Sequence, residues 1–131
     1  MEQLEELKNW IMGFPLWGDV VLTVDITGAE PGACGLFPVG MEQLSLRQDV
    51  LGQTVRRLRQ QFLLRRQAVR GQDAAGWLLE FQKWAAENAH LAPQFGAQQQ
   101  LRAEKGRLVT AAQTGLGLYE VRLTVEYTDN Y

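Results

Sequence analysis

The sequence predicts one α+β domain over residues 1–131, with a mainly antiparallel β-sheet packed against two helices. Two segments place apolar residues three and four positions apart, as amphipathic helices do, and the C-terminal segment alternates apolar and polar residues as a strand does. With 131 residues the chain can bury a core without disulfides or a metal ion. Its 46% hydrophobic and 21% charged residues are typical of a folded globular protein and argue against disorder.

The first predicted helix covers residues 3–14. Glutamates in its first turn favour the helix dipole, and the Gly-Phe-Pro sequence at 13–15 ends it. We expect Trp10 and Trp17, near its end, to be partly exposed candidates for a protein interface. The apolar stripe of this helix consists of Leu4, Leu7, Ile11 and Phe14.

A first strand is predicted over residues 19–27, where apolar residues alternate with polar ones. The following GAEPGACG sequence, residues 28–35, predicts a loop that contains Cys34, the only cysteine. We expect Leu36–Val39 to form a short extended piece before Gly40.

Residues 54–70 have an ambiguous pattern. Leu58 and Phe62 suit a helix, but together with Leu64 and Ala68 they also share one face of a strand. The β-branched ends and the Arg/Gln alternation favour a long strand. Such a strand would extend about 50 Å at about 3.3 Å per residue, so we expect a bulge or bend in it.

The clearest helix is predicted over residues 73–90, with Asp73 as a plausible N-cap and Pro93 shortly after its end. A hairpin follows over residues 106–128, with arms at 107–114 and 118–128 and a turn at 115–117. One face of its strictly alternating second arm should pack on the helix. The predicted core consists of Trp77, Phe81, Trp84, Tyr119, Val121, Leu123 and Val125.

The net charge of −2 is distributed unevenly along the chain. Residues 1–46 carry seven acids and one base, for a net charge of −6. Residues 47–70 carry seven arginines and one acid, for +6, and residues 71–131 carry −2. This separation bears on partners, because complementary blocks can attract one another between copies.

An arginine cluster within residues 54–70 is therefore the main candidate for a functional surface. Its side chains could neutralise phosphates as a small nucleic-acid-binding module, or pair with the acidic first third of a neighbouring copy. They could also form a solvated strand face that blunts an exposed sheet edge. The candidate oligomer-interface residues are Arg56, Arg57, Arg59, Arg65, Arg66 and Arg70.

The sequence contains little that could perform catalysis. His90 is expected at the surface, with no reason to meet Cys34, and Ser45 lacks the glycines of a nucleophile elbow. The GAEPGACG loop lacks the lysine and hydroxyl residue of a phosphate loop. We therefore predict no enzyme and no catalytic, cofactor or metal site. The enzyme alternative would require a deep pocket with convergent polar groups.

We expect a soluble protein that begins in the cytoplasm. Its N-terminal residues lack the basic start and apolar run of a signal peptide. No apolar stretch approaches the roughly 18 residues needed to span a bilayer.

Three segments carry a resemblance to a known family: SLRQDVLGQTVRRLRQQFLLRRQAVR, GWLLEFQKWAAENAHLAPQFG and LYEVRLTVEYTDNY. Together with the N-terminal helix and first strand, over about residues 1–130, the chain resembles the tail-terminator and minor capsid (tail completion) proteins of long-tailed phages and prophages of Gram-positive bacteria. The tryptophan-bearing helix and the aromatic-ended last strand are its most telling parts.

The resemblance implies a tail-terminator-like fold and a virion structural protein, present in the host cytoplasm during assembly. Such a protein forms a ring, usually a hexamer, that caps the tail tube, stops tail polymerisation and meets the head connector. The implied partners are further copies of the chain, the tail tube and head-completion proteins, with no membrane and no cofactor. The arginine-rich strand would then line the ring or meet the next subunit.

Overall fold

The computed structural model describes residues 2–15, 22–24, 34–48, 50–69, 74–111 and 116–130. Along the chain these residues form α1 (Glu2–Met12), β1 (Leu22–Val24), β2 (Cys34–Gln48), β3 (Thr54–Val69), α2 (Ala74–Asn88), the short 3-10 helix η1 (Ala89–Leu91), β4 (Ala97–Ala111) and β5 (Leu116–Asn130).

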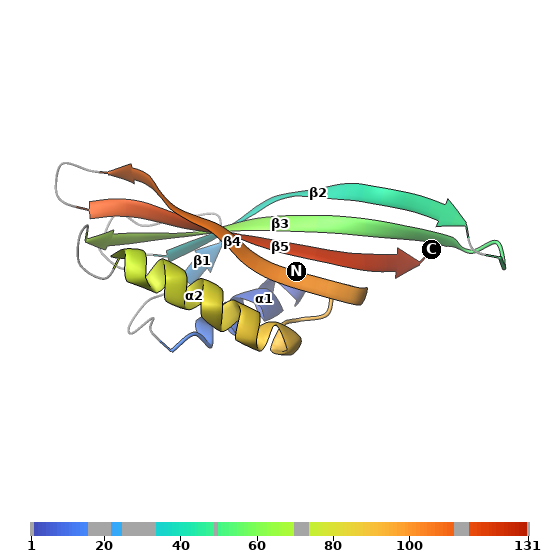
Figure 1. Ribbon diagram of the computed structural model, residues 1–131, viewed down its shortest axis with the longest axis horizontal. Helices are drawn as coiled ribbons and strands as arrows, with labels where there is room; N and C mark the ends of the chain where they lie inside the picture. Colours follow the sequence, from blue (N-terminus) through green and yellow to red (C-terminus); the bar gives the residue numbers. More distant parts are fainter. Residues whose placement is uncertain are drawn as a thin grey trace.

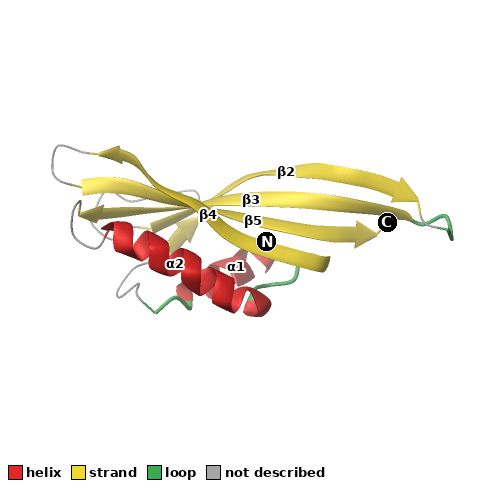
Figure 2. Cartoon of the chain, in the orientation of Figure 1, coloured by secondary structure: helices red, strands yellow, loops and turns green. Residues whose placement is uncertain are grey.

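The strands form one sheet in the order β1-β2-β3-β5-β4. The four long strands are antiparallel neighbours, and the three-residue β1 pairs in parallel with the start of β2. This antiparallel sheet with two main helices confirms the predicted α+β class (Figure 2).

Both helices lie on the same face of the sheet and cover only part of its length (Figure 1). Strands β2 and β3 continue well beyond the helices and end in a hairpin far from α2. The molecule therefore has a two-layered part and a part in which the sheet lies bare.

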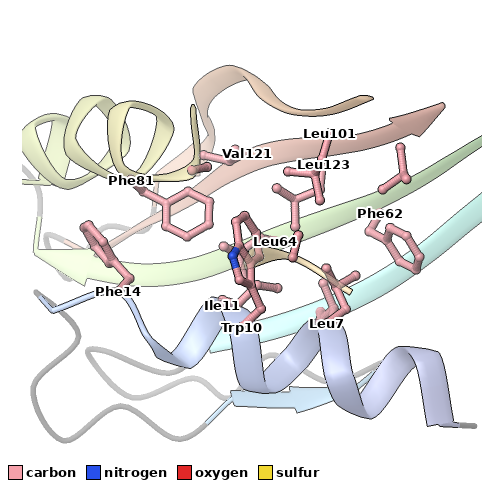
Figure 3. Packing of buried hydrophobic residues seen from close by; sticks show 14 of the residues in the cluster. Leu7, Trp10, Ile11, Phe14, Phe62, Leu64, Phe81, Leu101, Val121 and Leu123 are labelled. Carbon is pink, nitrogen blue, oxygen red and sulfur yellow. The ribbon is translucent and has the colours of Figure 1, made fainter. Parts of the chain in front are cut away.

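The core lies between the helices and the sheet. Leu7 and Ile11 of α1 point toward the β3 side chains, while Phe81 of α2 lies near Val121 (Figure 3). All four of these side chains are fully buried. A single apolar cluster thus joins both helices to the sheet.

The predicted core residues lie in or against this cluster. Trp77 and Phe81 of α2 are buried, as are Tyr119, Val121, Leu123 and Val125 of β5. Trp84 is half-buried and packs against the cluster.

Trp10 was predicted to be partly exposed, and this was wrong: it is buried at 9% exposure. Its ring centroid lies 4.9 Å from that of Trp84. Its Nε1 donates a hydrogen bond of 3.1 Å to the carbonyl oxygen of Asn88. The tryptophan therefore joins the two helices, and its polar atom is satisfied inside the protein.

The ambiguous segment is the strand β3, as predicted. Of the expected bulge or bend, a bulge is absent from its pairing with β5. β3 pairs with β5 without interruption from Val55 to Val69. The irregularities lie elsewhere, with two register shifts in β2 beyond its pairing with β1 and three between β4 and β5. The edge strand β4 and this part of β2 accept extra residues because each has only one paired neighbour to disturb.

Two strands are longer than the sequence predicted. The short piece at Leu36–Val39 is part of the 15-residue β2, and Cys34, expected in a loop, is buried at the start of that strand. The first hairpin arm, expected to begin at residue 107, begins at Ala97. The helices match closely: α1 ends at Met12, two residues before the predicted end, and only the last two residues of the predicted 73–90 helix, Ala89 and His90, belong to η1.

Several predictions lie outside the described residues: the ends of the 19–27 strand, residues 28–33 of the loop, Trp17, Arg70, the N-cap Asp73, the end of the first hairpin arm at 112–114 and Gly115 of the turn. Leu116 and Gly117, also predicted in that turn, are the first residues of β5, so this part of the prediction was wrong.

Candidate interaction surface

The arginine-bearing strand occupies the middle of the sheet. β3 lies between β2 and β5, so the interpretation that its arginines blunt an exposed edge is wrong. Alternation along β3 also divides the arginines between the two faces of the sheet. Arg56 and Arg66 share the face of the helices, whereas Arg57, Arg59 and Arg65 lie on the opposite face. The five described arginines therefore do not form one patch.

On the face opposite the helices, Arg65 and Arg107 hold a carboxylate between them. Arg65 Nε donates to Glu120 Oε2 at 3.0 Å, and Arg107 Nε donates to Glu120 Oε1 at 3.2 Å. The Glu120 side chain is only 4% exposed, although it lies on the face without helices. The buried carboxylate of Glu120 is stabilised because hydrogen bonds from the two guanidinium groups replace those that it would form with water.

A second ion-paired cluster surrounds Glu126. Arg59 lies 2.8 Å from Glu126 Oε1 and 3.3 Å from Glu42 Oε2, and Arg102 lies 3.7 Å from Glu126. The hydrogen bond from Arg59 lowers the pKa of the Glu126 carboxyl and, reciprocally, raises the pKa of Arg59. The acidic partners of β3 thus come mostly from β5 of the same chain.

The remaining described arginines of β3 are also held within the chain. Arg56 forms a 2.8 Å ion pair with Asp129. Arg57 Nη1 donates to the Gln98 carbonyl oxygen at 2.9 Å and to Thr128 Oγ1 at 3.0 Å. Arg66 stacks 5.4 Å from the centre of the Trp77 ring, and burial lowers its pKa. Contact of these arginines with another subunit stays a prediction.

Most of the exposed large apolar side chains in the described part of the chain lie at the bare end of the hairpin. We call residues 38–57 the arm: the outer part of β2, the connecting residues and the start of β3. Every residue of β2 from Pro38 to Gln48 is exposed. The exposed apolar side chains of the arm are Val39 at 49%, Met41 at 56%, Leu44 at 38%, Leu46 at 56%, Val50 at 101% and Leu51 at 81%.

The strand pairing and the extent of the helices explain why these side chains are exposed. Met41 pairs with Gln60 and Leu46 pairs with Arg56, which places both on the face that bears the helices. The helices end before this part of the sheet (Figure 1). Val39 and Leu44 are the extra residues at the two register shifts of β2. At the tip, Gly52 has a φ of 80°, a conformation that favours glycine in a tight turn.

The outer edge of β2 is also open along the arm. On the edge of β2 opposite β3, β1 pairs only with Cys34–Leu36, and no strand in the described part of the chain pairs with that edge beyond Leu36. An open strand edge with exposed apolar side chains is a surface on which another protein can dock.

A small recess lies away from the arm, between the end of α1 and the C-terminal half of α2. It has a volume of about 230 Å³ and is lined by Phe14, Pro15, Glu80, Lys83, Trp84 and Glu87. Metabolite sites usually measure about 300–1,000 Å³, so this recess suits a protruding side chain better than a small molecule.

The other residues considered for chemistry lie apart. Burial raises the pKa of the Cys34 thiol to about 12, which makes it a poor nucleophile at neutral pH. His90 is exposed on η1. Within the described ranges, no group of three or more His, Cys, Asp or Glu side chains could hold a metal ion. None of the helices described is long and apolar enough to cross a membrane.

Comparison of the sequence with protein-family models and with curated proteins finds no match.

Sequence reasoning missed the arm, although one signal for it was present. The apolar residues of segment 38–53 recur at spacings of two, three, two, four and one, which fit neither a helix nor a half-buried strand.

Proposed function

We propose that the chain is a structural protein of a phage or prophage virion: a tail terminator or minor capsid component that caps the tail tube and joins it to the head connector. It would act as a ring of copies, possibly a hexamer, within the virion and, during assembly, in the host cytoplasm. The resemblance of three long segments to that family supports this proposal.

One structural observation favours a protein whose work is contact with other proteins. The arm exposes six large apolar side chains and an open strand edge beyond the helix-covered part of the sheet. Leaving such side chains in water costs free energy, about 25 cal/mol for each Å² of apolar surface, that an assembled particle would recover.

The arginines give less support to the alternative of a nucleic-acid-binding module. Arg56, Arg59 and Arg65 each lie within ion-pair distance of a carboxylate in the same chain. Phosphates would have to displace these carboxylates. The positive charge available for binding nucleic acid is therefore smaller than the net charge of +6 carried by residues 47–70.

Disruption of the gene in its phage or prophage, followed by electron microscopy of induced particles, tests the proposal. We expect tails of abnormal length and heads without attached tails, because tube growth would no longer be stopped and joined. The neighbouring genes should encode tail-tube, tape-measure and head-completion proteins. Normal particles after disruption would contradict the proposal.

A variant pair separates the role of the arm from a general loss of stability. Leu51→Ser on the arm should fail to restore normal particles, whereas Val109→Ser, at an exposed apolar position on β4, should restore them. Equal rescue by both variants would contradict a role for the arm.

A further inference from the structure

The tip of the arm and the recess between the helices have complementary shapes and chemistry. We propose that Val50 and Leu51 at the tip of one copy insert into the Phe14–Trp84 recess of a second copy. This inference rests on the proposed function, because it specifies how the copies of a ring would contact one another.

The tip provides anchor side chains. Val50 is 101% exposed and Leu51 is 81% exposed, the two highest values among the large apolar residues of the described chain. They stand at the end of the β2–β3 hairpin, and β5 pairs with β3 along this extension as far as Val55. Apolar anchors presented on a rigid element lose little conformational freedom on binding.

The recess provides a matching receptor. The Phe14 and Trp84 rings lie 5.7 Å apart at one side of it, and Pro15 adds a further apolar wall. Its volume of about 230 Å³ is small for a metabolite. Aromatic walls that receive one or two aliphatic side chains are typical of the energetic centre of an interface.

Charge favours the same pairing. Around the tip, residues 46–57 contain three arginines and one aspartate; one of the arginines, Arg56, is paired with Asp129, which leaves a net charge of +1. The recess is rimmed by Glu80 and Glu87, against one lysine, Lys83. An arm with positive charge around an apolar tip would therefore approach an apolar recess with a negative rim.

The contact must form between two molecules. The tip lies at the end of the sheet beyond the helices, whereas the recess lies between the end of α1 and α2 (Figure 1). Such a contact joins different surfaces of the two copies, so a pair of copies keeps an unoccupied recess on the first copy and an unoccupied tip on the second. Repetition of a contact of this kind generates a closed ring, or an open chain if the rotation does not close.

A mixing experiment with full-length chains tests the proposal by sedimentation velocity. Leu51→Asp places a charged side chain at the apolar tip and leaves the recess unchanged. The double variant Glu80→Arg/Glu87→Arg reverses the charge of the recess rim and leaves the tip unchanged. We expect the wild type to associate with increasing concentration, and each variant alone to associate at least about 30-fold more weakly. An equimolar mixture of the two should form a dimer and no larger species, because one intact tip meets one intact recess.

Two matched variants control for charge and for general destabilisation. Val109→Asp introduces the same side chain at an exposed apolar position outside the arm and recess. Glu5→Arg/Glu6→Arg makes the same charge change on exposed positions of α1. Both should associate like the wild type.

Other contacts between copies would give different results. If two tips or two β2 edges contacted each other, the recess variant would still associate with itself. The mixture would then associate no more strongly than the two variants do separately. Either result would overturn the proposal, as would a wild type that remains monomeric at about 1 mM. If association fails while gene disruption still produces defective tails, only this inference falls. If the mixture forms dimers but disruption leaves particles normal, the proposed function falls instead.

Discussion

The two ends of the same sheet face different surroundings. In the covered part, Leu64 of β3 and Val121 of β5 are fully buried beneath the helices. On the arm, Met41 and Leu46 lie on the same face of the sheet and are each 56% exposed. Alternation along a strand decides which face a side chain occupies, but the layer above decides whether it is buried.

The first prediction compares one residue from each part and has the largest expected effect. Phe81→Ala should lower the free energy of unfolding by about 3–5 kcal/mol, because Phe81 is fully buried and packs against Phe14 and Trp84. Leu46→Ala on the arm should change it by less than about 0.5 kcal/mol. Urea unfolding followed by circular dichroism measures both, and similar losses for the two variants would break the comparison.

The second prediction concerns the face without helices, where burial has a different cause. Glu120→Gln should lower the free energy of unfolding by about 1–3 kcal/mol, because it removes the charge that binds Arg65 and Arg107 at a nearly buried position. Glu42→Gln is the matched control: its side chain is 64% exposed and its 3.3 Å pair with Arg59 should contribute about 0–0.5 kcal/mol. A larger loss for Glu42→Gln would show that exposure does not govern these ion pairs.

The third and smallest effect is the pH dependence contributed by Glu126. Its pKa is lower in the folded protein than its ordinary value of 4.5, chiefly because of the hydrogen bond from Arg59. The unfolded chain therefore binds the proton first as the pH falls, so this stabilisation is complete above about pH 5 and disappears as the pH falls through the folded pKa.

Denaturant unfolding at several pH values between about 6 and 3 checks this direction. The difference in unfolding free energy between the wild type and Glu126→Gln should shrink on acidification. A difference that grows as the pH falls would contradict the role of Arg59.

The comparison of the two ends also explains what the sequence could predict. The alternation from Tyr119 to Tyr127 and the spacing of Trp77 and Phe81 indicated β5 and α2 because each has one buried face. β2 was underestimated because its outer residues are exposed on both faces and leave no periodic signal.

The candidate surface was only partly predictable for a related reason. The arginine block is visible along the sequence, but its partners Glu120, Glu126 and Asp129 lie more than 50 positions away and meet it only through the β3–β5 register. The exposure of the apolar residues of the arm could not be predicted from the sequence, because it depends on the helices ending short of them in the fold.

Hydrogen–deuterium exchange of the wild-type chain at low and high protein concentration tests the central claim, that the arm is where copies meet. The account predicts that amides of the arm exchange rapidly in dilute solution and become protected as the concentration rises, while those of Val121 and Leu123 stay protected throughout. Exchange in the arm that is the same at both concentrations would contradict it.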